Sequence, residues 1–261
     1  MKTTANGIDI RYDITGSGPW ITFIHPLAVD LTVWDAQVAA LASGFTVLRF
    51  DARGHGQTAA PAGAYRLEQM AEDVIGLLDA LGVERTHLVG LSMGGMIAQH
   101  VALKAPGRLD RLVLAGTTSY YPPESQPAWD ERLRIVSAQG VEPMVAPTLE
   151  RWFTEPYRAA HPEIVDRIGG LIRATPLAGY LGSCEAIRHI DTREGLRGVN
   201  LPTLVLVGDQ DAGTPLPMAE AIQSAIAGSR LEVISSAAHL SNIEQAAAFN
   251  GLVKDFLGGL G

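Results

Sequence analysis

The feature that most constrains the fold is a tight turn at residues 90–94, which separates a strand pattern from a helix pattern. Residues 86–89 include β-branched side chains suited to a buried strand, and residues 95–103 combine alanines with other helix-compatible residues. The turn itself is Gly-Leu-Ser-Met-Gly. A strand that passes directly into a helix holds the middle residue, Ser92, in a strained conformation and leaves no room for flanking side chains. The pattern therefore predicts a strand, a sharp turn and a helix, with the Ser92 hydroxyl raised clear of a sheet.

A G-x-S-x-G turn between a strand and a helix is typical of a nucleophilic serine. The turn would expose the Ser92 hydroxyl and place the Met93 backbone N–H at the start of a helix, where it can meet an oxyanion. The alternative is a glycine-rich turn whose serine has no chemical role. The pentapeptide alone does not separate these interpretations, but its context and the partners described below favour the nucleophile.

The composition indicates one large α/β domain with an inserted lobe. The chain has 261 residues, 47% of them hydrophobic and 18% charged, which allows a substantial core and disfavours disorder. Its 20 basic and 28 acidic residues give a formal net charge of −8, and no basic stretch favours nucleic acid or a membrane surface as a partner. The single cysteine, Cys184, excludes an internal disulfide and fits a reducing compartment.

Targeting signals are not evident in the sequence. Residues 1–13 are too polar for a signal peptide, and no apolar run is long enough to span a bilayer. We therefore expect a soluble, cytoplasmic protein. The sequence leaves the oligomeric state, including a homo-oligomer, open.

Strand and helix patterns alternate in both terminal parts of the chain, which favours the α/β class with a mostly parallel, doubly wound sheet. The expected strands are 8–14, 20–24, 45–50, 86–89, 109–114, 203–207 and 231–234. Apart from the helix after Ser92, the expected helices here are 34–41, 67–81, 218–226 and 244–257. The middle of the chain is almost entirely helical in pattern, at 131–139, 145–153, 162–174 and 177–187. We therefore expect a core domain of residues 1–118 and 200–261 and a helical cap, or lid, of residues 119–199.

Two loops after late strands carry candidate partners for Ser92. A carboxylate after the strand at 203–207 could orient a histidine, and both Asp209 and Asp211 are available there. Asp209 directly follows a glycine and is suited to stabilising the turn. Asp211 lies further out in a G-x-x-D pattern, so we choose Asp211. The candidate histidine is His239, which follows the last expected strand.

The chain order Ser92, Asp211, His239 is the order of the serine triad on α/β sheets. In such a triad His239 takes the serine proton and returns it to the leaving group, while Asp211 orients the imidazole and stabilises its cation. The backbone N–H groups of Leu27 and Met93 would hold the developing oxyanion. A surface loop residue is the alternative interpretation of His239. Its position after the last strand, in order with the other two, makes that alternative the weaker one.

Other conspicuous polar residues have structural explanations. His25 either shapes the loop that leads to Leu27 or borders a pocket. A base role for His55 is disfavoured, because a better-placed histidine lies near the C-terminus. Asp51 and Arg53 are expected to brace the glycine-rich loop around His55 by a charge-assisted hydrogen bond.

Aromatic residues of the expected cap are candidates for a pocket wall. Trp129, Trp152 and Tyr180 either pack within the cap or contact a substrate, and packing is the more common fate of such residues. We take these three, with His25, as candidate substrate-pocket residues.

Motifs for metals and cofactors are not found. The seven histidines are dispersed, and neither an H-E-x-x-H motif nor a Cys/His cluster occurs. No G-x-G-x-x-G or Walker loop is present. We therefore expect chemistry that needs neither a metal nor a cofactor.

The chain resembles the α/β-hydrolase fold superfamily over nearly its whole length, and within it the 3-oxoadipate enol-lactone hydrolase group. The resemblance is carried by Asp-Leu-Thr-Val-Trp-Asp at 30–35, Asp-Ala-Arg-Gly-His-Gly at 51–56, Gly-Leu-Ser-Met-Gly-Gly at 90–95, Gly179-Tyr180, Cys-Glu-Ala-Ile at 184–187 and Ala-His-Leu-Ser-Asn-Ile-Glu-Gln at 238–245. The cap segment and the histidine loop are its more specific parts. The resemblance implies a catalytic triad of Ser92, Asp211 and His239 and an oxyanion hole formed by the Leu27 and Met93 amides.

The resemblance predicts a serine hydrolase that cleaves a small-molecule carboxylic ester or lactone through an acyl-enzyme. The loop His-Pro-Leu-Ala-Val at 25–29 departs from the Ser-Asn-Ser-Leu-Gly-Thr typical of enol-lactonases. This departure keeps a general short-chain carboxylesterase, with a perhydrolase or haloperoxidase side activity, as an alternative. A non-enzymatic ligand receptor is a further alternative that an intact triad disfavours. The carboxylate of the lactone would favour a cationic partner in the cap, and the candidates are Arg132, Arg134, Arg151, Arg173 and Arg188.

Overall fold

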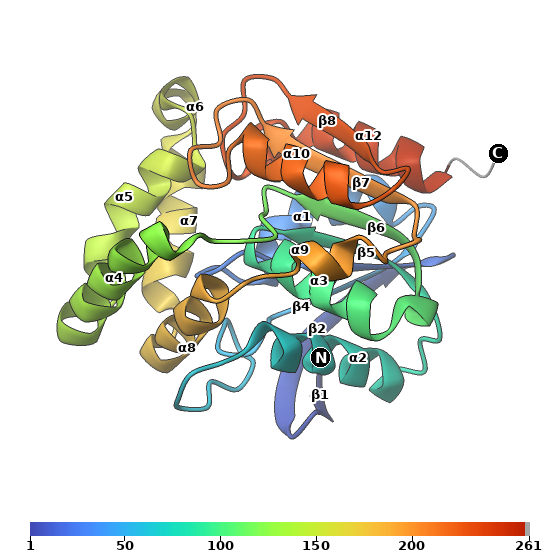
Figure 1. The fold of residues 1–261 in the computed structure, drawn as a ribbon, viewed down its shortest axis with the longest axis horizontal. Helices are drawn as coiled ribbons and strands as arrows, with labels where there is room; N and C mark the ends of the chain where they lie inside the picture. The colour runs from blue at the N-terminus through green and yellow to red at the C-terminus, as the bar shows by residue number, and fades with distance from the viewer. Residues whose placement is uncertain (259–261) are drawn as a thin grey trace.

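A computed structural model describes residues 1–258 and contains one eight-stranded sheet in the order β1-β2-β4-β3-β5-β6-β7-β8 (Figure 1). Its strands are β1 Lys2–Ala5, β2 Ile8–Gly16, β3 Trp20–Ile24, β4 Thr46–Phe50, β5 Thr86–Leu91, β6 Leu109–Ala115, β7 Thr203–Gly208 and β8 Arg230–Ile234. β2 pairs antiparallel with both β1 and β4. In the remaining order β4-β3-β5-β6-β7-β8, each strand is parallel to the next one. The predicted mostly parallel sheet of the α/β class is therefore confirmed.

The two faces of the sheet carry separate groups of helices (Figure 1). One group consists of α1 Asp35–Leu41 and α12 Ala246–Gly258, which pack against each other. The other consists of α2 Leu67–Ala80, α3 Met93–Lys104, α9 Arg193–Leu196 and α10 Leu216–Ala225, linked by contacts of α2 with α3, α3 with α9 and α9 with α10. β5 and β7 are buried along their whole length, because helices cover both of their faces.

Five of the helices between β6 and β7 form the inserted helical region. They are α4 Gln126–Gln139, α5 Glu142–Trp152, α6 Glu155–Ala160, α7 Pro162–Ala174 and α8 Leu177–Arg188. In Figure 1 they stand together at one end of the sheet, in yellow-green to gold, with α4 against α5 and α8, and α5 against α7. The segment is the one from which a cap was expected.

The structure contains two short elements that were not predicted, and it divides one predicted helix in two. β1 was not predicted, because a four-residue polar strand is stabilised by its pairing with β2 rather than by a hydrophobic pattern. α6 was also missed; it is only six residues long and depends on the Thr154 side chain, which accepts a hydrogen bond from the Tyr157 N–H. The predicted closing helix 244–257 is instead α11 Ser241–Glu244 and α12, separated at Gln245, whose φ of −125° is not helical.

The predicted bond between Asp51 and Arg53 is wrong. The Arg53 guanidinium instead donates to both carboxylate oxygens of Asp73 on α2, at 2.6 and 2.8 Å. Asp51 accepts the backbone N–H groups of Leu31 and Gln57, at 2.9 and 2.8 Å. The two side chains therefore still brace the loop, but each ties it to a different part of the core.

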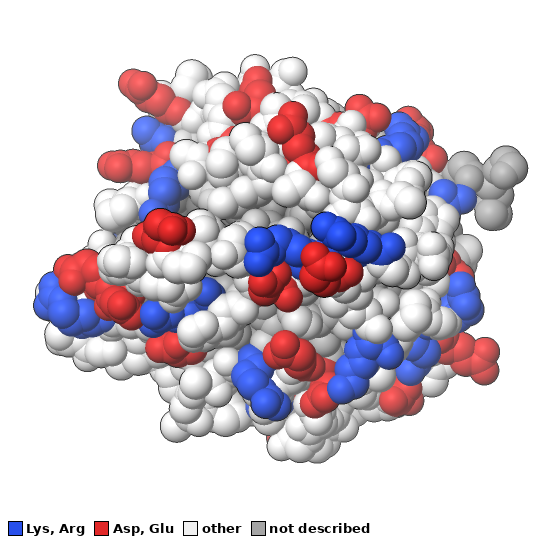
Figure 2. Space-filling view, viewed as in Figure 1, with Lys and Arg blue, Asp and Glu red and all other residues white. Residues whose placement is uncertain are grey.

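The charged surface is mixed. The face seen in Figure 2 carries acidic and basic side chains next to one another rather than a continuous basic area. Within residues 1–258, no helix combines the length and the apolar character that crossing a membrane requires.

Candidate active site

The turn between β5 and α3 is strained at Ser92, as the sequence predicts. Ser92 has φ 56° and ψ −117°, a conformation that side chains with a Cβ rarely adopt. The glycines on either side make it possible. A Cβ on Gly90 would lie 2.2 Å from the Gly94 carbonyl oxygen, and a Cβ on Gly94 would lie 2.1 Å from the Ile24 carbonyl oxygen. The turn therefore depends on close backbone contacts that only glycine permits.

Hydrogen bonds fix the strained residue from several directions. The Ser92 N–H donates to the Ala115 carbonyl on β6 at 2.9 Å. The Ser92 carbonyl accepts the Met96 N–H at 3.0 Å and the Thr117 hydroxyl at 2.8 Å. The surrounding structure thus holds the serine backbone in a conformation that would otherwise relax.

The structure brings His239 and Asp211 into direct contact. The His239 Nδ1 and the Asp211 Oδ2 are 2.8 Å apart, and both side chains are buried. Asp209 makes no such contact; its carboxylate accepts the Ala237 N–H at 3.2 Å and holds the turn. The catalytic role of Asp211 stays a prediction, and of the two acids it is the one whose carboxylate contacts His239.

Backbone and hydroxyl donors complete the environment of Asp211. Its Oδ1 accepts the N–H groups of Gly213 and Thr214, at 2.8 and 2.9 Å, and its Oδ2 accepts the Thr214 hydroxyl at 2.8 Å. Burial alone would raise the pKa of the Asp211 carboxyl, but His239 and the Thr214 donors outweigh it and hold this pKa below its usual range. Asp211 is therefore an anion that faces the histidine.

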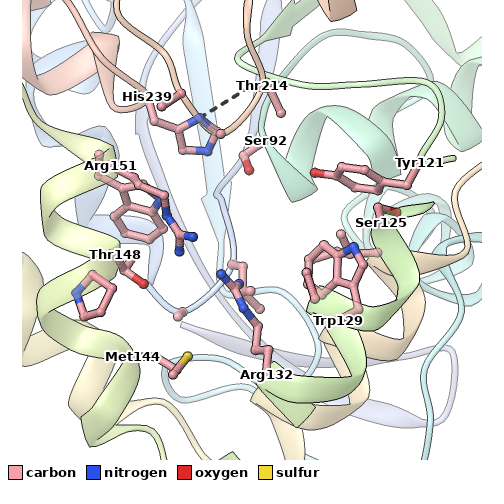
Figure 3. A pocket seen from close by; sticks show the side chains of 18 of the residues that line it. Ser92, Tyr121, Ser125, Trp129, Arg132, Met144, Thr148, Arg151, Thr214 and His239 are labelled. Carbon is pink, nitrogen blue, oxygen red and sulfur yellow. Dashed lines mark hydrogen bonds between the residues drawn. The ribbon is translucent and has the colours of Figure 1, made fainter. Parts of the chain in front are cut away.

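Ser92 and His239 face the same cavity (Figure 3). The His239 ring nitrogen that does not contact Asp211 is directed toward the Ser92 side chain in this view. Two further backbone N–H groups are candidates for binding an oxyanion. The Met93 N–H opens α3, where the first N–H groups of a helix have no internal acceptor. Within residues 1–258, the Leu27 N–H also has no acceptor, and Leu27 lines the cavity.

The cavity has a volume of about 480 Å³ and lies between the core and the inserted helices. Trp129, Trp152 and Tyr180, predicted from the sequence as candidates, all line it. The Trp152 ring also stacks on the His239 ring, with the centroids 6.0 Å apart. Burial raises the pKa of Tyr180 to about 12, so its hydroxyl remains protonated at neutral pH.

The predicted pocket position of His25 is wrong. Its side chain is fully buried beneath the loop and does not line the cavity. Its Nε2 accepts the Ala52 N–H at 2.9 Å, and its Nδ1 donates to the Pro26 carbonyl at 2.7 Å. Both ring nitrogens are thus engaged in fixing the loop that carries Leu27, which is the structural interpretation of this residue.

Two arginines of the inserted helices line the cavity, Arg132 on α4 and Arg151 on α5. Within residues 1–258, neither forms an ion pair with a carboxylate. Arg132 lies over the Trp129 ring, 5.1 Å from its centroid. Burial, and after it the charge of Arg132, lower the pKa of Arg151. The cavity therefore holds two neighbouring cations without an ion-pair partner, and the carboxylate that also lines it, Glu131, pairs with Arg134 instead.

The three other candidate arginines are engaged elsewhere. Arg134 pairs with Glu131, Arg173 with Glu142, and Arg188 with Asp130. None of the three lines the cavity.

Sequence reasoning missed some of the lining residues. Tyr121 lies in the cavity, where burial raises the pKa of its hydroxyl to about 12. Its position shortly after the carboxyl end of β6 was a usable signal, because ligands of α/β sheets bind at these ends. The further lining residues that were not predicted include Met96, Ser125, Ile135, Met144, Thr148, Ile187 and Thr214. In the part of the chain that is described, no group of three or more His, Cys, Asp or Glu side chains could hold a metal ion.

Comparisons with known proteins identify the fold family of the chain. The model of the alpha/beta hydrolase fold family matches residues 19–246. A 3-oxoadipate enol-lactonase of Acinetobacter baylyi is 34% identical over 96% of this chain and 94% of its own length. The crystal structure of an enol-lactonase from Burkholderia xenovorans is 36% identical, covers 99% of this chain and 100% of that one, and has a TM-score of 0.95. A thermophilic esterase from Thermogutta terrifontis, with malate bound, is 30% identical over 99% of this chain and 98% of that one, with a TM-score of 0.94.

Proposed function

The chain belongs to the α/β-hydrolase fold family, and from this premise we propose that it is a serine hydrolase that cleaves carboxylic esters or lactones. The observation that carries the proposal is the 2.8 Å contact between Asp211 and His239, placed beside a strained serine in one cavity. This arrangement matches a serine nucleophile, its base and the acid that orients the base.

The acylation step follows from these positions. Asp211 fixes a proton on His239 Nδ1, which leaves Nε2 free to accept the Ser92 hydroxyl proton. The serine oxygen then bonds to the substrate carbonyl carbon, and the carbonyl electron pair moves to its oxygen. The Leu27 and Met93 N–H groups would donate to this oxyanion; the loss of one such donor typically costs about 3–4 kcal/mol. His239 returns the proton to the leaving oxygen as the ester bond breaks.

Deacylation repeats the same steps with water. A water molecule attacks the acyl carbon, and His239 accepts its proton. The bond from the acyl carbon to the Ser92 oxygen then breaks, and the serine regains its proton. With a lactone, the leaving oxygen stays attached to the acyl group, so acylation opens the ring and water releases one product.

For the substrate we propose a lactone or ester that carries a separate carboxylate, with 3-oxoadipate enol-lactone as the first candidate. Two cations without an anionic partner, Arg132 and Arg151, support an acid group on the ligand. The names of two relatives are those of enol-lactonases, and malate is bound to a third protein of the same fold. The alternative within this proposal is a general esterase that does not need the acid group.

An arginine substitution separates these two versions. Arg132→Gln should lower kcat/KM for the lactone by about 10- to 100-fold, because a charge-assisted bond is worth about 1.5–3 kcal/mol. The same change should leave hydrolysis of a neutral p-nitrophenyl ester nearly unaltered. Arg173→Gln is the matched control, because Arg173 pairs with Glu142 and neither residue lines the cavity. Equal losses on both substrates would count against an acid subsite.

The proposed function itself is tested by assaying the wild type and Ser92→Ala on both substrates. We expect turnover by the wild type and a loss of about 10⁴-fold or more in Ser92→Ala. If the wild type turns over neither substrate, or if Ser92→Ala is equally active, the proposal of a serine hydrolase is wrong. A ligand receptor would then be favoured.

A further inference from the structure

The loop that carries His239 is attached to the inserted helices as well as to the core. We call residues 237–244 the histidine loop and residues 152–154, at the end of α5, the α5 end. The Leu240 N–H of the histidine loop donates to the Trp152 carbonyl at 3.1 Å. The Trp152 ring stacks on the His239 ring with an interplanar angle of 28°. The inserted helices thus touch the candidate catalytic base directly.

The buried carboxylate of Glu244, the last residue of the histidine loop, joins this loop to the α5 end. Glu244 is only 7% exposed. One of its oxygens, Oε2, accepts the Ala238 N–H at 2.8 Å. The other, Oε1, accepts the Thr154 N–H at 3.0 Å and also the Thr154 hydroxyl. Each oxygen is therefore committed to one segment, and Ala238 immediately precedes the base.

The choice of a carboxylate at this position needs a reason. Burial of an anion is costly, and within residues 1–258 Glu244 has no ion-pair partner. Only the three donors offset this cost. A carboxylate is the group that presents acceptors in both directions, whereas an amide would turn an NH₂ group toward donors on one side. The chemistry of the side chain therefore matches a link between two sets of donors.

The core side of the histidine loop is held separately. The Asn242 side-chain amide donates to the Val33 carbonyl at 2.9 Å, and the Gln37 amide donates to the Asn242 carbonyl at 2.9 Å. The loop is thus anchored to the core through Asn242 and to the inserted helices through Glu244.

We propose that Glu244 is a positioning residue. Its carboxylate holds the α5 end against the histidine loop, and this fixes the position of the His239 ring relative to Trp152 in the cavity wall. The residue acts through Ala238 and Thr154 and does not touch the substrate. The proposal rests on the proposed function, because it assigns Glu244 a part in placing the base for acylation.

The kinetic test uses Glu244→Gln, with Glu232→Gln as the matched control. Glu232 lies on β8, pairs with Arg230 and is far more exposed. Activity is expressed per active site, titrated with an organophosphate, which removes any unfolded fraction from the comparison. We expect kcat to fall by about 10- to 100-fold, with a smaller change in KM, because a displaced base slows chemistry more than binding. An unchanged kcat per titrated site, with only a lower Tm, would overturn the proposal.

A second variant examines the link from its other end. Thr154→Val removes one donor to Glu244 from the α5 end, together with the acceptor that caps α6, without altering the histidine loop. Its effect on kcat should be several-fold and should not add to that of Glu244→Gln in the double variant, because both changes break one linkage. Additive effects would overturn the proposal. If Glu244→Gln does not fold, Thr154→Val decides alone, and wild-type kcat in it contradicts the link.

Hydrogen exchange gives a readout that does not depend on hydrolysis. In Glu244→Gln, backbone amides of the histidine loop and of residues 152–157 should both exchange faster than in the wild type, while Glu232→Gln leaves both unchanged. Faster exchange in neither segment, or in only one, contradicts the link. An inactive wild type would remove the proposed function, and the exchange result would still test the contacts of Glu244.

Discussion

The turn at Ser92 and the cavity wall formed by the inserted helices are built in opposite ways. Around the turn, backbone atoms approach so closely that Gly94 has no room for a single Cβ. Across the cavity, Arg132 and Arg151 have no carboxylate partner within the described residues. The turn at Ser92 is held by its own backbone contacts, whereas the cavity wall presents two cations that a ligand could pair with. In the proposed function, the core sets the reaction and the inserted helices select the substrate.

The largest expected effect lies on the core side of this comparison. Asp211→Asn should lower kcat by about 10⁴-fold, because the histidine would lose both its orientation and the anion that stabilises its cation. Asp209→Asn is the matched control, since an amide oxygen can still accept the Ala237 N–H. Steady-state kinetics on the p-nitrophenyl ester measures both variants. Similar activities of the two would mean that the sequence-based choice between the acids was wrong.

Two glycine substitutions compare how tightly the regions are packed. Gly94→Ala should destabilise the protein by about 3 kcal/mol or more, since the added methyl would overlap the Ile24 carbonyl. Gly170 lies in α7, is exposed, and has no atom near the position of an added Cβ. Gly170→Ala should therefore stabilise by about 0.5–1 kcal/mol through helix propensity. Urea unfolding measures the change in the free energy of unfolding of each variant. Equal changes in both would contradict the difference in packing.

The effect that is smallest near neutral pH concerns acid stability. Burial, followed by the charge of His25, lowers the pKa of His55 to about 3. Because an unfolded histidine titrates near pH 6.5, the unfolded chain gains a proton first as the pH falls. The free energy of unfolding should therefore decrease from about pH 6.5 down to about pH 3. His55→Gln should reduce this slope by about 1.4 kcal/mol per pH unit.

Urea unfolding at pH 6, 5 and 4 measures the slope. The control is His189→Gln, because His189 is exposed on the inserted helical region. Its slope should equal that of the wild type. A slope unaffected by His55→Gln would show that the buried core histidine does not limit acid stability.

The sequence predicted the core much better than the cavity wall, and the reason is physical. Glycine spacing and strand–loop positions are local signals, so the turn at Ser92 and the proximity of Asp211 to His239 could be inferred. Which of five arginines meets the cavity depends on how α4 and α5 are rotated and packed. Arg132 and Arg134 lie two residues apart on α4, yet Arg132 lines the cavity and Arg134 pairs with Glu131.

Two other failures have the same origin. His25 was a candidate for the pocket wall, but its ring turns under the loop to reach Ala52. Arg53 was paired with Asp51, its neighbour in the chain, although its partner is Asp73, 20 residues away. In each case a long-range contact outweighed a local expectation, and such contacts leave little trace in a single sequence.

The most direct test of the account is covalent labelling with a fluorophosphonate, followed by intact-mass analysis and peptide mapping. If the core sets a serine hydrolase reaction, the wild type should gain one phosphonyl group per chain, on Ser92, and Ser92→Ala should gain none. Arg132→Gln should still be labelled, because its change lies in the substrate wall. Absence of label on the wild type, or label on another residue, would contradict the assignment of the reaction to the turn at Ser92.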